Sequence, residues 1–190
     1  MNTEEKGSDF PKAGFSRLIR LFENTDDVVK LTRAFGLASK VHRGQLFNRS
    51  EPYINHSLRV AMILVEELQI RDPQIVCAAL LHDATDASDE EIRDCGEVVL
   101  ALVRAAAEPK ANPEDKEKSL AEYFKKIAQA PREARCIRIA DRLDSVRSMK
   151  GQATRAAKYR EEIEKYVVPL ANATDDRLAF KLSLALYELK

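Results

Sequence analysis

The stretch of residues 72–83, Asp-Pro-Gln-Ile-Val-Cys-Ala-Ala-Leu-Leu-His-Asp, decides the fold. Asp72-Pro73 is a helix start signal, because Asp can cap a helix and proline fits its first position. The apolar run of residues 75–81 predicts a buried helix that continues to about Ala84. The run ends on His82-Asp83, and a carboxylate beside an imidazole is costly at the edge of a core unless something compensates it. A bound cation is the simplest compensation, and mixed nitrogen and oxygen donors suit a divalent metal.

Helical patterns continue on both sides of this stretch. Asp26 or Asp27 and Asn55 are expected to cap helices, and Ser88 with Glu91 matches a capping box. We expect helices over residues 15–23, 26–42, 56–68, 72–84, 88–96, 98–107, 115–129, 131–149, 154–168 and 174–189. Nothing in the sequence alternates as a strand would. The sequence therefore predicts an all-α fold, a compact bundle of helices, with residues 1–14 as a flexible leader and residues 15–190 as one domain.

The composition narrows the classes of partner. Lys and Arg together number 31, as do Asp and Glu, whereas a protein that binds duplex nucleic acid is normally basic. A small phosphorylated ligand remains compatible with a local basic pocket. The odd number of cysteines (Cys77, Cys95 and Cys136) predicts buried, reduced thiols. We expect a cytoplasmic protein, because the sequence shows neither a signal peptide nor a membrane span. It sets no expectation for the oligomeric state.

Four residues form a candidate metal site. His56 lies near a predicted helix start, and Asp141 interrupts the apolar pattern of residues 137–143. Arg142 or Arg147 could simply pair with Asp141 inside the protein. A metal that joins His56, His82, Asp83 and Asp141 explains all four residues at once. Two imidazoles and two carboxylates would leave positions open for water and substrate, as catalytic metal sites require.

Four segments together resemble the HD-domain metallohydrolases and, more narrowly, the hydrolase domain of the RelA/SpoT family. They are residues 41–45 (VHRGQ), 51–56 (EPYINH), 78–83 (AALLHD) and 139–147 (IADRLDSVR). The resemblance extends over about residues 28–150. It implies an all-α domain with one Mn²⁺ held by the same two histidines and two aspartates. It also implies removal of the 3′-pyrophosphate from the alarmones ppGpp and pppGpp. Because the sequence ends at Lys190, we expect a small stand-alone hydrolase similar to the single-domain SpoT homologues.

The sequence departs from the family pattern just after His82-Asp83. The family continues with Glu-Asp, where this chain has Asp86 and Ala87. Asp86 is the candidate catalytic residue for positioning water or accepting its proton, and it shares a helix face with Asp83 if the helix continues that far. The alternative is that Asp86 is a capping or turn residue near Ser88.

Further departures affect the expected substrate contacts. Phe47 and Asn48 replace an Arg-Lys pair of the family, and Ser145 replaces an asparagine. Phe47 would either stack on a base or fold into the core. The candidate substrate-binding residues are Arg43, Phe47, Asn48, Arg49, Tyr53, Arg142, Ser145 and Arg147.

Three functions fit this sequence. The first is an alarmone pyrophosphohydrolase. The second is an HD phosphohydrolase that acts on another nucleotide, such as NADPH or a nucleoside polyphosphate. The third is a catalytically weak module that senses nucleotide. The loss of the family aspartate at Ala87 favours the third, whereas four intact candidate ligands favour the first two.

Overall fold

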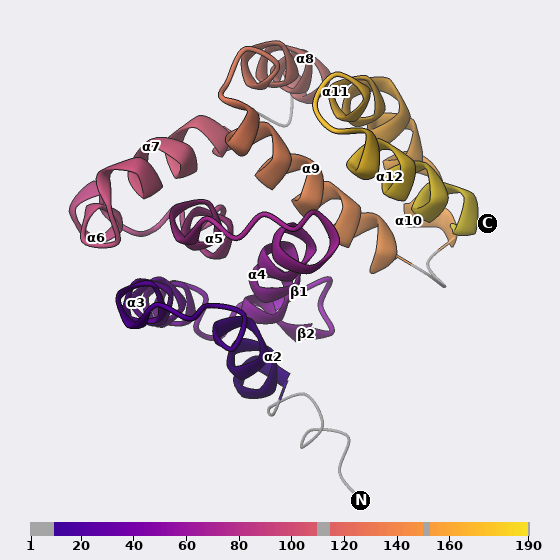
Figure 1. The fold of residues 1–190 in the computed structure, drawn as a ribbon. Coiled ribbons are helices and arrows are strands. Elements are labelled where there is room, and N and C mark those ends of the chain that lie inside the picture. Colours follow the sequence, from indigo (N-terminus) through magenta and orange to yellow (C-terminus); the bar gives the residue numbers. More distant parts are fainter. Residues whose placement is uncertain (1–9, 110–114, 150–152, 190) are drawn as a thin grey trace, which may run out of the picture. The chain divides into compact units, whose positions relative to one another are not determined.

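The computed structural model describes residues 10–109, 115–149 and 153–189, and it confirms the all-α fold (Figure 1). The chain divides into two compact units, residues 1–103 and 104–190, and each unit is described by itself. Helix α7 (Glu97–Ala106) contains the boundary between them. None of the helices in the described ranges combines the length and apolar character that crossing a membrane requires.

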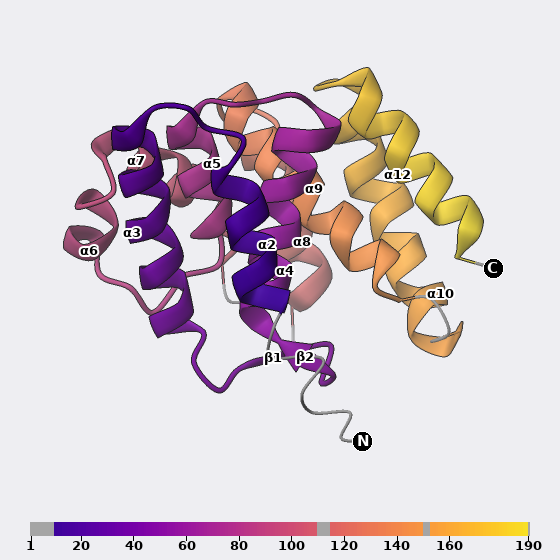
Figure 2. The same ribbon diagram turned by 60° about the horizontal axis from the view of Figure 1, so that its bottom comes forward.

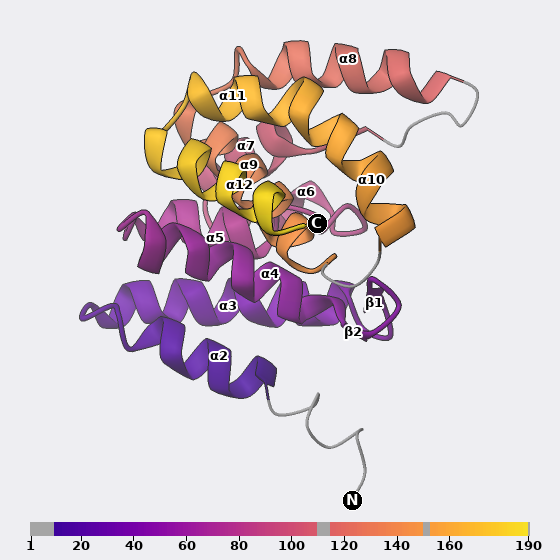
Figure 3. The same ribbon diagram turned by 90° about the vertical axis from the view of Figure 1, so that its right-hand side faces the viewer.

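The first unit packs four main helices around a leucine-rich core. Helix α5 contacts both α3 and α4, and α2 packs on α4, as Figures 2 and 3 show. Leu31, Leu58, Leu64 and Leu80 are fully buried within it. The elements are α2 (Phe10–Ile19), α3 (Thr25–Val41), β1 (Leu46–Phe47), β2 (Glu51–Pro52), α4 (Tyr53–Met62), the π-helical turn η1 (Ile63–Glu67), α5 (Pro73–Leu80) and α6 (Asp89–Arg93).

Capping residues explain where several helices begin. The Asp72 side chain accepts a hydrogen bond from the Gln74 N–H at 2.8 Å, as predicted for the start of α5. Ser88 and Glu91 form the predicted capping box of α6. Helix α3 is capped instead by Asn24, so the prediction of Asp26 or Asp27 was wrong by two or three residues.

Helix α4 begins earlier than predicted. Its first residue is Tyr53, so Asn55 lies inside the helix and is not its cap. The reason is a short hairpin that the sequence pattern did not indicate: β1 and β2 pair antiparallel, and the chain passes from Pro52 directly into α4. The hairpin turns through Asn48 and Arg49, which have φ values of 50° and 61°, and the Ser50 N–H donates to the Phe47 carbonyl at 3.1 Å. This is the turn geometry that suits the twist of a two-stranded hairpin.

Two further boundaries differ from the predictions. Helix α5 ends at Leu80, not Ala84, because the chain leaves the helix through a turn at residues 81–83. Helix α2 begins at Phe10, so residues 10–14 of the predicted leader are helical, and residues 1–9 lie outside the described residues.

The second unit is organised around α9 (Arg132–Arg147), a helix with eleven buried residues. Helices α10, α11 and α12 all contact α9, and α11 and α12 also pack on each other (Figure 1). The π-helical turn η3 (Ile163–Val167) joins α10 to α11 and lies within the helix predicted over residues 154–168. The remaining bounds are α8 (Lys116–Ile127), α10 (Ala153–Glu162), α11 (Val168–Asn172) and α12 (Asp176–Glu188).

Candidate metal centre

The end of α5 fixes the position and the tautomer of His82. Residues 76–81 are completely buried, and His82 directly after them is only 1% exposed. His82 Nδ1 lies 2.8 Å from the Ala79 carbonyl oxygen. A carbonyl can only accept, so Nδ1 carries the proton and Nε2 presents its lone pair. Nε2 faces the Asp83 carboxylate, with Oδ2 at 3.3 Å.

The first two turns of α4 bring His56 and Tyr53 to the same place. His56 is fully buried, and its ring centroid lies 5.2 Å from that of His82. The Tyr53 hydroxyl donates a hydrogen bond of 2.6 Å to Asp83 Oδ2. Within the first unit, His56, His82 and Asp83 each offer one ligand atom, and these atoms lie within 4.8 Å of one another. The first unit therefore brings its three predicted metal ligands together.

The hairpin covers His56 and is held against α4. The Phe47 ring stacks on His56 with centroids 4.1 Å apart and planes inclined by 4°. Arg59 of α4 forms a two-pronged ion pair with Glu51 of β2, with N–O distances of 2.9 and 2.7 Å. Phe47 is 8% exposed, so of its two predicted roles the structure favours packing in the interior over stacking on a base. The hairpin limits the rotation of His56.

This donor set fits a divalent metal ion. Two imidazoles and one carboxylate are the ligand types of zinc, manganese and related ions. A histidine that binds metal almost always donates its other ring N–H to a carbonyl or carboxylate, as His82 does to Ala79. The Tyr53 hydroxyl on Asp83 similarly orients the carboxylate. The side chains of the first unit can thus hold a divalent metal.

In the second unit, Asp141 lies on α9 and pairs with Arg138. Arg138 Nη1 is 2.7 Å from Asp141 Oδ2, whereas Arg142 Nε lies 3.8 Å away. Arg138 also donates to the Ala106 carbonyl at 3.2 and 2.7 Å and stands over the Tyr123 ring. Arg142 was one of the two predicted partners of Asp141, with Arg147, but Arg138, one helical turn before Asp141, is closer and was not predicted.

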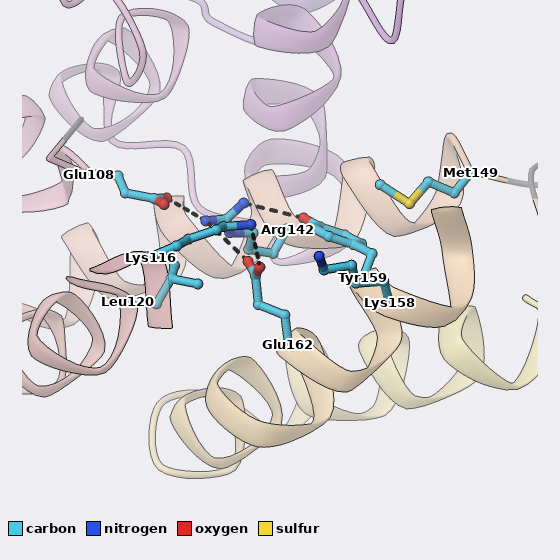
Figure 4. Close-up of a pocket in the computed structure, with 8 residues that line it drawn as sticks. All are labelled: Glu108, Lys116, Leu120, Arg142, Met149, Lys158, Tyr159 and Glu162. Atoms are coloured by element: carbon cyan, nitrogen blue, oxygen red, sulfur yellow. Dashed lines mark hydrogen bonds and ion pairs between the residues drawn. The ribbon is translucent and has the colours of Figure 1, made fainter. Parts of the chain in front are cut away.

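A pocket of about 530 Å³ lies beside Arg142 in the second unit (Figure 4). Arg142 contacts Glu108 and donates to the Tyr159 hydroxyl at 3.3 Å, and its guanidinium lies 3.9 Å from Glu162. Burial acts to lower the pKa of Arg142, but Tyr159 and the surrounding carboxylates outweigh it and raise that pKa well above its usual value. Arg142 is therefore permanently charged, although its neighbours already neutralise much of that charge.

The pocket also contains side chains that the sequence pattern did not indicate. Lys116 and Lys158 line it together with Tyr159. Tyr159 is hydrogen-bonded to Ser145, and burial raises the pKa of its hydroxyl. These residues lie in highly charged helical segments that resemble an ordinary solvated face, so no local pattern marked them.

The other predicted site residues have varied settings. Arg43 and Arg49 are exposed, and Asn48 is half-buried in the hairpin turn. Ser145 is buried and Arg147 half-buried on α9. Asp86 is exposed in the turn that follows α5, and Ala87 is buried. The condition under which Asp86 would share a helix face with Asp83 is not met, because α5 ends before both residues.

This fold and site define the class of the protein, which is all-helical with histidine and aspartate ligands for a divalent metal. The chain belongs to the HD-domain family, whose model matches residues 34–175. Individual relatives narrow this family to the predicted RelA/SpoT hydrolases.

Those relatives include guanosine-3′,5′-bis(diphosphate) 3′-pyrophosphohydrolases. The MESH1 protein of Danio rerio is 31% identical over 66% of this chain and 72% of its own length. The MESH1 protein of Homo sapiens is 32% identical over 65% of this chain and 71% of its own length. The bifunctional (p)ppGpp synthase/hydrolase SpoT of Escherichia coli K12 is 32% identical over 70% of this chain, which corresponds to only 20% of SpoT.

A solved structure agrees with these sequence matches. It is that of a metazoan ortholog of SpoT that hydrolyses ppGpp and plays a role in starvation responses. It superimposes with a TM-score of 0.73 at 27% identity and covers 89% of this chain and 99% of its own.

Proposed function

We propose that this protein is a metal-dependent hydrolase that removes the 3′-pyrophosphate from ppGpp and pppGpp. The cluster of His56, His82 and Asp83, with the His82 tautomer fixed by the Ala79 carbonyl, carries this proposal. The relatives named as 3′-pyrophosphohydrolases support the choice of substrate.

Mn²⁺ is the proposed metal, and Asp141 is the proposed fourth ligand. The first-unit donors fit Mn²⁺ as well as other divalent ions. Asp141 has the chemistry that completes the set, and it lies 2.7 Å from the guanidinium of Arg138. When bound, the metal supplies a lowered pKa for water and positive charge beside the phosphate.

The protein's own residues orient the reaction. Ala79 holds His82 in the tautomer that presents Nε2, and Tyr53 holds the Asp83 carboxylate. Asp86, exposed in the turn after α5, is the proposed group that positions water or accepts its proton. Arg43, Arg49 and Arg142 are the proposed contacts for phosphate oxygens.

A nucleotide panel tests the proposal. Purified protein loaded with Mn²⁺ is given ppGpp, pppGpp, NADPH and nucleoside triphosphates, and released phosphate and pyrophosphate are measured. We expect pyrophosphate from ppGpp and pppGpp. A protein that binds metal but leaves both alarmones intact would refute the alarmone activity.

The three histidines provide a matched control for the metal. His82→Ala should lose both bound metal and turnover, because it removes one of two imidazole ligands. His42→Phe changes the one histidine outside the cluster and should keep the metal. Retention of metal and activity by His82→Ala would refute the site. Asp141→Asn should weaken metal binding if Asp141 is a ligand, and unchanged affinity would exclude it from the set.

One observation favours a second candidate function. The buried methyl group of Ala87 stands where the family has an aspartate, so part of the expected acidic pair is missing. A different nucleotide, such as NADPH, or a weak nucleotide-sensing role would be consistent with that loss. Asp86→Glu with Ala87→Asp should raise alarmone hydrolysis, whereas no gain would favour another substrate.

A cytoplasmic location is also proposed. Cys77, Cys95 and Cys136 are free and buried in the structure. Reduced thiols of this kind are typical of a reducing compartment.

A further inference from the structure

His42 is the histidine that the proposed metal site leaves unused. It follows the last residue of α3 and is 5% exposed. Its ring stacks on Tyr53, with centroids 4.5 Å apart and planes inclined by 26°. Tyr53 is the residue whose hydroxyl holds Asp83. His42 therefore lies one aromatic ring away from the candidate metal centre.

The hydrogen bonds around His42 fix its tautomer. Its Nδ1 lies 2.9 Å from Gln45 Oε1. The orientation of the Gln45 amide is itself determined, because Gln45 Nε2 donates to the Val41 carbonyl at 3.2 Å. An amide oxygen can only accept, so His42 Nδ1 carries the proton and Nε2 is left with a lone pair. Burial is the largest influence on the pKa of His42 and lowers it, which favours this neutral form.

The Nε2 atom of His42 is a buried acceptor that the described residues do not satisfy. It is enclosed, yet it has no hydrogen-bond partner in the described part of the chain. More than nine in ten buried polar groups in proteins do have a partner, so a donor from outside the protein is expected here. The candidate metal site is close by, because His42 stacks on Tyr53 and the Tyr53 hydroxyl is bonded to Asp83.

We infer that His42 Nε2 accepts a hydrogen bond from a water molecule held in the site formed by His56, His82 and Asp83. This inference rests on the proposed hydrolase function. A water with one O–H directed at His42 has its oxygen lone pairs free to face the phosphate. His42 is then a positioning residue for hydrolysis. The Ala87 side chain offers no hydrogen-bond acceptor and Asp86 is exposed, whereas His42 supplies a buried acceptor near the site.

Three variants separate the acceptor from the shape of the ring. His42→Phe keeps a ring to stack on Tyr53 and removes both nitrogens. His42→Gln places an amide oxygen near the position of Nε2 and so restores an acceptor. Gln45→Leu changes an exposed residue and leaves the ring intact, but it removes the acceptor that keeps the proton on Nδ1.

Steady-state kinetics with ppGpp, together with metal content, provides the first test. We expect kcat to fall about tenfold in His42→Phe, the effect of losing one hydrogen bond, with KM and metal content close to wild type. His42→Gln should recover most of this loss, and Gln45→Leu should lose part of kcat with His42 still present. Wild-type kcat in His42→Phe, or a Gln variant no better than Phe, would overturn the inference. A parallel loss of metal would show a structural role instead and would equally overturn it.

A second measurement does not depend on turnover. Long-range ¹H–¹⁵N spectra of the metal-free protein report which imidazole nitrogen is protonated. We expect protonated Nδ1 and bare Nε2 for His42 at neutral pH, and a proton on Nε2 would overturn the inference. If the wild-type protein hydrolyses no alarmone, the proposed function fails on that result, while the spectra still decide the state of His42.

Discussion

Replacing Arg138 by Met removes the centre of the buried polar network in the second unit. Arg138 is 2% exposed and makes its 2.7 Å contact with Asp141 while donating twice to the Ala106 carbonyl. Met fills part of the same volume but leaves Asp141 without its nearest positive charge. Removing one partner of a buried ion pair costs about 3 to 5 kcal/mol.

Urea unfolding followed by circular dichroism measures this cost. With a slope of about 2 kcal/mol per molar, a loss of about 4 kcal/mol lowers the midpoint by about 2 M. Arg132→Met is the matched control, because Arg132 lies on the same helix, its side chain is 47% exposed, and its partner Asp175 keeps a second ion pair with Arg177 at 3.1 Å. Exposed pairs are worth about 0 to 1 kcal/mol, so its midpoint should move by 0.5 M or less, on the order expected from that slope.

The same experiment tests the role of Asp141. If Asp141 is a metal ligand, Mn²⁺ replaces part of the positive charge that Arg138 supplied. The difference in urea midpoint between Arg138→Met and wild type should then be smaller with Mn²⁺ than with a chelator. Equal differences with and without Mn²⁺ would count against Asp141 as a ligand. A midpoint for Arg138→Met no lower than that of Arg132→Met would refute the network as a source of stability.

Three other perturbations have defined outcomes. Arg59→Met removes two hydrogen bonds to Glu51 and should lower the stability of the hairpin by about 1 to 2 kcal/mol. This loss should appear as faster amide exchange in residues 46–52, and unchanged exchange would contradict the role of Arg59 in holding the hairpin. Arg49→Gly should raise the free energy of unfolding by about 1 kcal/mol, because glycine adopts the positive φ of the hairpin turn without strain; a lower midpoint in urea would contradict this. Burial raises the pKa of Tyr123 to about 12, so its contribution to stability is full below pH 10 and is lost as the pH rises through 12. Tyr123→Phe should flatten the pH dependence of unfolding between pH 10 and 12, at a cost of about 1 kcal/mol for the lost bond to the Ala106 carbonyl; an unchanged slope would contradict the assignment.

Local signals in the sequence predicted much of the fold. Asp72 and Ser88 cap the helices that directly follow them, and both predictions are confirmed. The cap of a helix and its first turn are adjacent in the chain, so their chemistry is visible in a short window. The all-α class followed from the same repeated signals.

The hairpin could not be predicted in the same way. Each strand has only two residues, which is too short to show alternation. The hairpin is held by Arg59, eight residues beyond Glu51, and by a turn whose two central residues are not glycine. This non-local arrangement moved the start of α4 ahead of Asn55.

The site was predictable to the extent that its residues follow strong motifs. His56, His82 and Asp83 meet as expected, because the ends of two packed helices place them. Of the predicted partners of Asp141, Arg142 does lie 3.8 Å away, but the spacing did not indicate that Arg138, one helical turn earlier, is closer. The Ala106 carbonyl, 32 residues from Arg138 in the chain, accepts from Arg138 and so helps to hold its guanidinium beside Asp141.

The stack of Phe47 on His56, with Tyr53 perpendicular to both rings, also gives the site optical and magnetic signatures of its own. The chain contains no tryptophan, so tyrosine emission is not masked. Emission from Tyr53 should be quenched by the Asp83 carboxylate that accepts a hydrogen bond from its hydroxyl, and it should change when that carboxylate takes up a metal. The ring current of Phe47 should shift the carbon-bound protons of His56 upfield, so that the integrity of the hairpin can be monitored through a ligand residue. The protein thus contains a native reporter of metal binding that needs no added label.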